Sequence, residues 1–215
     1  MSRTPLAVRV SFVALAAASE LMFASAVSAT ASSEDACAPS NPRIALGFNL
    51  DLLPTVASAV NGKLGYAPQI WVSLERVRIR LVGAHLEPPD AFAAAPSGFH
   101  SPTLTAFAAV IDYTFGERLN GFWIGSGFEQ WQNSIEHEGV AAPVYWQSTV
   151  FTLGGGYIWR VAGDFYIDPW IGAHGILNPR SVSVDAYEFR PLPVQAEASL
   201  KIGWFFELAR ASRKP

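Results

Sequence analysis

The sequence predicts an all-β protein, an eight-stranded antiparallel up-and-down transmembrane β-barrel that follows an N-terminal signal peptide. In eight segments, apolar residues alternate with small or polar ones, which is the period of β-strand side chains. The connections between these segments alternate between short turns and long loops, as they do in transmembrane barrels. Only 15% of the residues are charged, against roughly 25% in an ordinary soluble domain. Much of the outer surface is therefore expected to face something other than water.

The N-terminus carries the pattern of a secretory leader, which we assign to residues 1–29. Two arginines precede an apolar run, and the small residues 27–29 suit a cleavage site, although its exact position stays open. A transmembrane helix would need about 20 apolar residues, and Glu20 interrupts the run. Residues 30–42 are rich in Ser, Ala and Pro, so we expect a flexible lead-in. The single cysteine of the chain, Cys37, lies there and has no partner for an internal disulfide.

The barrel region is expected to span residues 43–208, and its first half contains four strands. Pro54 should end the first strand or form a bulge in it. Asn61-Gly62 should form a turn, and the strand could partly resume between Pro54 and Asn61. No amphipathic helix is predicted anywhere in the barrel region. Glu75-Arg76 forms a tight turn, and the proline-rich residues 85–101 form a long loop. The four predicted strands are 44–52, 64–75, 77–84 and 103–115.

The second half contains four more strands, separated by short turns around Asn120-Gly121 and at 160–164 and by long loops at 132–143 and 176–192. The run Gly154-Gly155-Gly156 would weaken an isolated strand but suits a sharply curved barrel wall. The four predicted strands begin at Phe122, Val144, Phe165 and Val194, and the last ends at Leu208.

Alternation alone does not say which face of the wall points outward. In a secreted, lipocalin-like barrel the apolar face would line the cavity. Here the less apolar face is rich in Gly, Ala and Ser and carries isolated charges, unlike a densely charged solvated surface. Aromatic residues also gather near the short turns, as in the aromatic girdle of a membrane protein. They are Tyr113, Phe115, Phe122, Tyr157, Trp159, Phe165, Trp204 and Phe206. We therefore expect the apolar face to point outward.

The last strand carries the spacing polar-x-Gly-x-x-aromatic-x-apolar, filled by Lys201, Gly203, Phe206 and Leu208. This spacing resembles the C-terminal assembly signal of bacterial outer-membrane β-barrels, and residues 43–208 resemble the small OmpA-, OmpX- and OmpW-like barrels. The resemblance implies a location in the outer membrane, contact with outer-membrane lipid, and recognition of the last strand by the barrel assembly machinery. The short tail 209–215 departs from the pattern, because such barrels usually stop at the terminal aromatic or apolar residue.

If the less apolar face points inward, charged residues collect in the lumen. Eight strands enclose a space that side chains largely fill, and an isolated buried charge is very costly, so these groups must pair. Arg80, Asp112, Asp168 and Lys201 are expected at similar depth, the first two on neighbouring strands and the last two likewise. We predict a salt-bridged interior, with a narrow channel through the same charges as the alternative. The predicted interior polar cluster is Arg78, Arg80, Asp112, Glu129, Asp168, His174 and Lys201.

No catalytic, metal or cofactor site is predicted. Lipid A-modifying enzymes of this barrel size need Ser, His and acidic residues at the outer rim. The candidates Ser134, Glu136, His137 and Glu138 fall in a polar loop and are expected to be surface residues. The four histidines show no ligand spacing, and the absence of a basic run argues against nucleic acid. We expect a monomer with a structural, surface-interaction or small-solute-binding role, its long loops open to an extracellular ligand.

Overall fold

The computed structural model describes residues 43–90, 97–116, 119–179, 181–184 and 187–208. The predicted signal peptide, the lead-in 30–42 and the tail 209–215 lie outside the described residues. None of the described helices is long and apolar enough to span a membrane.

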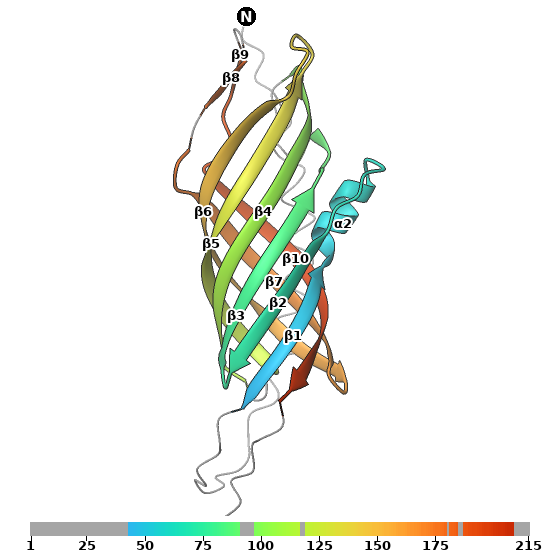
Figure 1. Ribbon diagram of the computed structural model, residues 1–215, viewed down its shortest axis with the longest axis vertical. Coiled ribbons are helices and arrows are strands. Elements are labelled where there is room, and N and C mark those ends of the chain that lie inside the picture. Colours follow the sequence, from blue (N-terminus) through green and yellow to red (C-terminus); the bar gives the residue numbers. More distant parts are fainter. Residues whose placement is uncertain (1–42, 91–96, 117–118, 180, 185–186, 209–215) are drawn as a thin grey trace, which may run out of the picture. The chain divides into compact units, whose positions relative to one another are not determined.

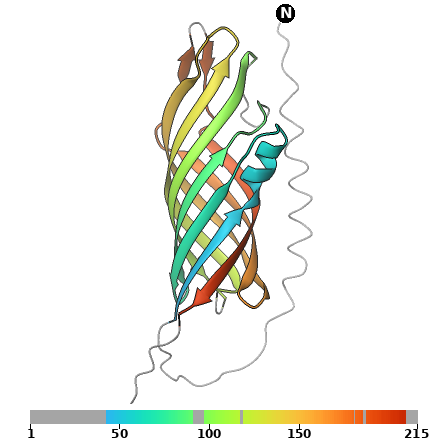
Figure 2. The ribbon, with the colours of Figure 1, turned by 45° about the vertical axis from the view of Figure 1, so that its right-hand side comes forward.

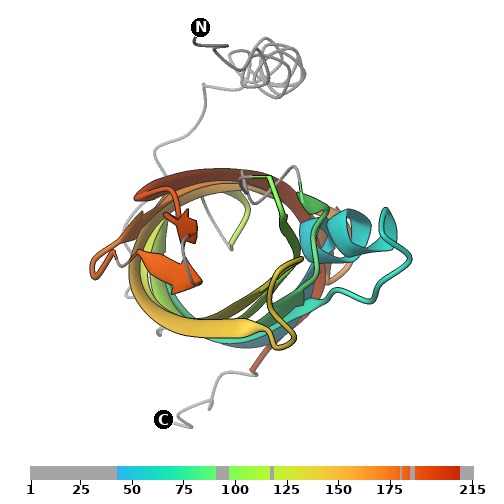
Figure 3. The same cartoon turned by 90° about the horizontal axis from the view of Figure 1, so that it is seen from above.

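Eight antiparallel strands close into a barrel in the order β1-β10-β7-β6-β5-β4-β3-β2 (Figure 1). The closed ring is seen end-on in Figure 3. This confirms the predicted all-β fold. The barrel strands are β1 (Ile44–Asp51), β2 (Ala67–Leu74), β3 (Val77–Leu86), β4 (Phe99–Thr114), β5 (Gly121–His137), β6 (Val144–Ala162), β7 (Phe165–Ile176) and β10 (Val194–Glu207). The last long loop also contains a small hairpin of β8 (Val182–Val184) and β9 (Tyr187–Phe189).

Short turns and long loops alternate as predicted. Two residues join β2 to β3 and β6 to β7, and six join β4 to β5. At the opposite end the connections after β1, β3, β5 and β7 have 15, 12, 6 and 17 residues, so only the one between β5 and β6 is short. The loop predicted at 132–143 is shorter than expected, because β5 continues to His137 and pairs with β4 back to Phe99. β5 and β6 therefore project beyond the neighbouring strands (Figure 2). We call the two ends of the barrel the short-turn end and the long-loop end.

The prediction that the barrel region contains no helix is wrong. Residues Leu52–Ala59 form the helix α2 immediately after β1. The Asp51 side chain caps the helix by accepting a hydrogen bond from the backbone N–H of Leu53. Pro54 lies in the first turn, where the missing N–H would have no intrahelical partner. A proline that could end a strand thus begins a helix.

The apolar face of the wall points outward. Along β2 and the first half of β3, burial alternates strictly from residue to residue. Ile70, Leu81 and Phe107 are exposed, whereas Arg78 and Asp112 are fully buried. This is the reverse of a soluble barrel, and it confirms the predicted orientation.

Candidate functional site

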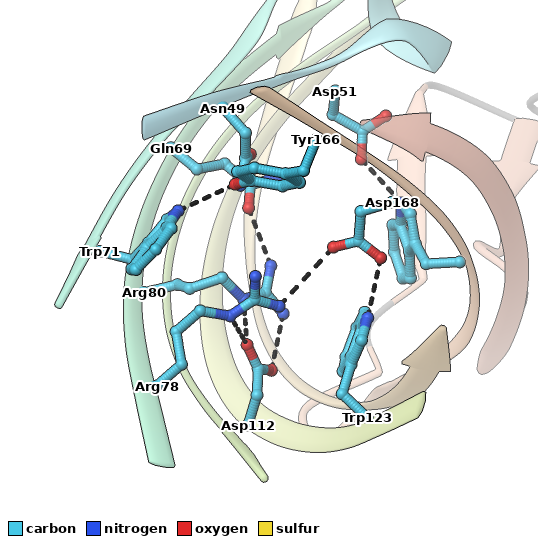
Figure 4. A network of polar contacts seen from close by, with 11 residues as sticks. Asn49, Asp51, Gln69, Trp71, Arg78, Arg80, Asp112, Trp123, Tyr166 and Asp168 are labelled. Atoms are coloured by element: carbon cyan, nitrogen blue, oxygen red, sulfur yellow. Dashed lines mark hydrogen bonds and ion pairs between the residues drawn. The ribbon is translucent and has the colours of Figure 1, made fainter. Parts of the chain in front are cut away.

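The centre of the lumen near the short-turn end is held by one carboxylate and two guanidinium groups (Figure 4). Asp112 on β4 pairs in register with Arg78 on β3, and Arg80 lies one inward position further along the same strand. Arg78 Nε donates to Asp112 Oδ2 at 2.7 Å, and Arg80 Nε donates to the same oxygen at 2.6 Å. Arg80 Nη2 also donates to Asp112 Oδ1 at 2.9 Å, and its Nη1 donates to Gln69 at 2.8 Å. Charged side chains that pair with one another therefore fill part of the lumen.

A second carboxylate, Asp168 on β7, extends the group across the lumen. Its Oδ2 lies 3.6 Å from Arg78 Nη2, and its Oδ1 accepts a hydrogen bond of 2.7 Å from Trp123 Nε1. We refer to Arg78, Arg80, Asp112 and Asp168 as the arginine–aspartate network. Every one of these side chains is buried. The network links β3, β4 and β7 and so crosses the barrel.

Lys201 lies opposite Asp168 in the β7–β10 register, but the two form no ion pair among the described contacts. Its Nζ is 4.0 Å from the centroid of the Trp170 ring and 5.0 Å from that of Trp123. The faces of indole rings attract cations, so the ammonium group is held between aromatic rings. The pairing of Lys201 with its cross-strand neighbour, which their depth suggested, is therefore not what the structure shows.

Aromatic side chains outside the predicted polar cluster complete the interior. Tyr166 is fully buried, and its hydroxyl accepts hydrogen bonds of 2.9 Å from Asn49 Nδ2 and from Trp71 Nε1 (Figure 4). Phe205 packs against the rings of Trp71 and Tyr166. Tyr166 and Phe205 lie at inward positions of the same strands as Asp168 and Lys201. Their place in the strand alternation is the sequence feature from which their burial could have been predicted. The lumen is filled by rings as much as by salt bridges.

Inward-facing glycines make room for this filling. A Cβ at Gly47 would lie 2.2 Å from the Trp71 ring, and one at Gly203 would lie 2.7 Å from the Tyr166 ring. A Cβ at Gly125 would lie 2.1 Å from Asp112 Oδ1. These contacts are far too short for a real side chain. The glycines therefore set where the bulky residues of the lumen can lie.

A separate polar group, which we call the histidine cluster, lies nearer the long-loop end and comprises Glu129, Thr152, His174 and Glu197. His174 Nε2 lies 2.8 Å from Glu197 Oε2, while its Nδ1 lies 2.8 Å from Thr152 Oγ1 and 3.2 Å from Glu129 Oε1. Thr152 also donates a hydrogen bond to Glu129, and so does Trp131 Nε1, at 2.6 Å. The Glu197 side chain keeps 25% of its surface exposed, against 7% for His174. Water therefore reaches this cluster.

His137 is not the loop surface residue that the sequence suggested. It ends β5, is buried, and packs its ring against Phe99 and Tyr187 at centroid distances of 4.7 and 4.3 Å. Phe99 belongs to an apolar cluster with Ile135, Val182 and Phe189 that fixes the β8–β9 hairpin to β4 and β5. No group of three or more possible metal ligands is found among the described residues. The candidates Ser134 and Glu136 lie in β5 as well.

No protein-family model and no curated protein matches the sequence. Among solved structures, the chain is similar to the N-terminal β-barrel domain of Pseudomonas aeruginosa OprF (15% identity, TM-score 0.44, 77% of this chain and 98% of that one). It is also similar to Neisserial surface protein A, with 14% identity, a TM-score of 0.42, and coverage of 76% of this chain and 94% of that one. A third similar structure is that of a major outer membrane protein from Thermus thermophilus, with 7% identity, a TM-score of 0.49, and coverage of 78% of this chain and 100% of that one. The strand pairing of this chain itself establishes that it is a closed, antiparallel, eight-stranded barrel.

Proposed function

We propose that the protein is an integral outer-membrane β-barrel with a structural, surface-interaction or small-solute-binding role, and that it is not an enzyme. The observation that carries the proposal is the inverted burial of the wall. Arg78, Asp112 and Asp168 are completely buried, whereas large apolar side chains are exposed on all eight barrel strands. Soluble monomers rarely expose apolar patches larger than a few hundred Å². A bilayer is the solvent in which this surface is stable.

The aromatic residues of the outer face support the same location. Trp204 stacks on Phe48 and contacts Phe165, Tyr113 contacts Phe115, and Phe122 contacts Tyr157. Phe48 lies at the middle of β1 and Phe115 directly follows β4, and the others lie in the short-turn half of their strands. Such rings are typical of the membrane–water interface. We assign the short-turn end to the periplasmic side, since short turns are periplasmic in outer-membrane barrels.

The buried interior supports a structural role over conduction. The arginine–aspartate network and the rings of Trp71, Trp123, Tyr166 and Phe205 occupy the lumen near the short-turn end. An ion path would require these groups to separate, and truncating one partner of a buried ion pair costs about 3–5 kcal/mol. The histidine cluster, in which the Glu197 side chain is 25% exposed, and the long loops remain as the places where a solute or an extracellular partner would bind.

The last strand is the proposed contact for the barrel assembly machinery. Lys201 and Gly203 face the lumen, whereas Phe206 and Leu208 are exposed on the outer face. The outward pair is thus available to a partner before insertion, and outer-membrane lipid would cover it afterwards. We propose that the folded protein is a monomer in the membrane.

Membrane fractionation followed by heat-modifiable gel mobility tests the proposal. We expect the protein in the outer-membrane fraction, resistant to carbonate extraction, with faster mobility before boiling than after it. In the variant Phe107→Asp a charge lies on the outward face. We expect this variant to be less stable in the membrane, since a charge at the lipid-facing midplane is destabilising. Recovery of the unmodified protein in the soluble periplasmic fraction would contradict the proposal.

A further inference from the structure

The barrel wall is incomplete at the long-loop end, between β10 and β3. β1 ends at Asp51, which pairs with Lys201, so residues 194–200 of β10 have no strand neighbour on that side. On the other flank, β2 begins only at Ala67, and a single bridge between Tyr66 and His85 continues its pairing with β3. We call this interruption the notch.

Helix α2 fills the notch. The backbone N–H of Leu53 donates to Ser199 Oγ on β10 at 3.1 Å, and Ser199 in turn donates to the capping carboxylate of Asp51. At the other end of the helix, Ser58 Oγ accepts a 2.9 Å hydrogen bond from the backbone N–H of Glu87, just beyond β3. The helix packs against β10, β3 and β2, the strands that border the notch. Figure 3 shows it lying at the ring of strands.

The helix is held less firmly than any strand of the wall. Its buried residues are Pro54, Ala57 and Ser58, which are small and bury little apolar surface. Each barrel strand, by contrast, is joined to two neighbours by a ladder of backbone hydrogen bonds. Segments with few buried contacts open most readily. Apolar side chains are exposed along the helix and at its C-cap, with Val56 61% and Val60 72% exposed.

We propose that α2 is a movable section of the barrel wall, and that the notch is a lateral entrance from the lipid to the lumen near the histidine cluster. This rests on the proposed membrane location. Outside the notch the surface is apolar, with Val56, Val194 and Leu200 exposed. Inside it, Glu197 and Ser199 present polar groups. The ligand class that fits both sides is an amphipathic molecule of the outer leaflet, with its head group in the lumen and its chain in the bilayer.

The first experiment measures the movement of α2 by distances between spin labels in reconstituted protein carrying Cys37→Ser. One label pair is Val56→Cys with Phe128→Cys, and the matched pair is Ile70→Cys with Phe128→Cys. The three positions are similarly exposed, at 61%, 60% and 62% for Val56, Phe128 and Ile70. We expect one narrow distance for the Ile70 pair and two distances for the Val56 pair. A single narrow distance for both pairs would overturn the proposal.

Removing the two serine ties should increase the open population. In Ser58→Ala/Ser199→Ala we expect the open-to-closed ratio to rise about tenfold, because each hydrogen bond contributes modestly to stability. Ser148→Ala is the control, since Ser148 is buried in the opposite part of the wall, on β6. An unchanged open-to-closed ratio in the double variant would show that the hydrogen bonds of Ser58 and Ser199 do not hold α2 in the wall. The narrow distance of the Ile70 pair reports barrel closure independently, so a misfolded or non-membrane protein would be recognised as such.

The second experiment tests passage. A fluorescent label at Glu197→Cys is exposed to a nitroxide-bearing stearate in the bilayer, and quenching is compared between the serine double variant and Ser148→Ala. We expect stronger quenching in the double variant. A label at Ile70→Cys should be quenched equally in both backgrounds. Equal quenching at position 197 in both backgrounds would refute a lateral entrance even if α2 moves.

Discussion

The two polar groups of the lumen differ in almost every physical respect. The arginine–aspartate network near the short-turn end has no solvent exposure at Arg78, Asp112 or Asp168, and its charges are shared among three strands. The histidine cluster near the long-loop end is partly exposed, with Glu197 open to water. Buried charges cost far more to separate than exposed ones. The first group therefore holds the barrel together, and the second is free to serve recognition.

The largest expected effect comes from breaking the buried network at its shared acceptor. Asp112→Ala leaves Arg78 and Arg80 without the carboxylate that both contact. Removing one partner of a buried ion pair costs about 3–5 kcal/mol. We expect a loss of this size in the free energy of unfolding, measured by urea titration of the lipid-reconstituted barrel. A loss below about 1 kcal/mol, the value for an exposed pair, would show that the two regions do not differ.

A smaller effect is expected from substituting a glycine on β5 or on β3, the two strands that flank β4. Gly125→Ala would drive a methyl group against Asp112 and the backbone oxygen of Ile111, and overpacking of this kind typically costs about 1–3 kcal/mol. Gly83→Ala is the control, because its Cβ would meet only the Phe107 ring, at 3.9 Å. Equal stability of the two variants in the same titration would argue against tight packing around the network.

The histidine cluster should tolerate substitution better. Glu197→Gln removes one carboxylate beside His174, but Glu129 and Thr152 still contact the ring. We expect a loss of about 1 kcal/mol, the contribution of one hydrogen bond, because Glu197 is partly exposed and His174 keeps its other partners. Binding of a solute at this end should change more than stability, which titration calorimetry would detect. A loss as large as that of Asp112→Ala would place this cluster among the structural elements.

The smallest effect is expected at the long-loop surface, where Lys63 lies 3.2 Å from Glu87. The hydrogen bond from Lys63 lowers the pKa of Glu87 from its ordinary value of 4.5. A lowered pKa stabilises the folded protein above the pKa of the unfolded state, and this contribution is lost as the pH falls through the folded value. Lys63→Met should therefore remove a small stability difference between pH 7 and pH 3, within about 0.5 kcal/mol. A difference unchanged by the substitution would assign it to other carboxylates.

Much of the fold could be predicted because strand periodicity is a local property of the sequence. The alternation around Ile79 and Ile111 predicted the strands, and the sparse charge of the opposite face predicted which side of the wall points outward. Helix α2 could not be predicted in this way, since eight residues are too few for a helical period and Pro54 also suits a strand end. Its formation depends on the cap at Asp51 and on Ser199, which lies 148 positions away in the chain.

The interior was predictable in composition but not in pairing. The alternation of side chains along the strands placed Arg78, Asp112 and Lys201 on the inward face. The similar distance of Lys201 and Asp168 from the short turns suggested that these two residues would meet. The indole rings of Trp123 and Trp170 instead take that position. Whether a cation meets a carboxylate or a ring depends on side-chain rotamers across the lumen, which no local pattern encodes. The burial of His137 was missed for a related reason, because the β8–β9 hairpin that covers it is distant in sequence.

The orientation of the wall is tested most directly by spin labels placed one at a time along β5, from Phe122 to Phe128, in lipid vesicles. Collision rates with oxygen, which dissolves in the bilayer, are compared with those of a water-soluble nickel chelate. We expect high oxygen and low nickel accessibility at positions 122, 124 and 128, and low accessibility to both reagents at position 123. High nickel accessibility at positions 122, 124 and 128 would contradict it.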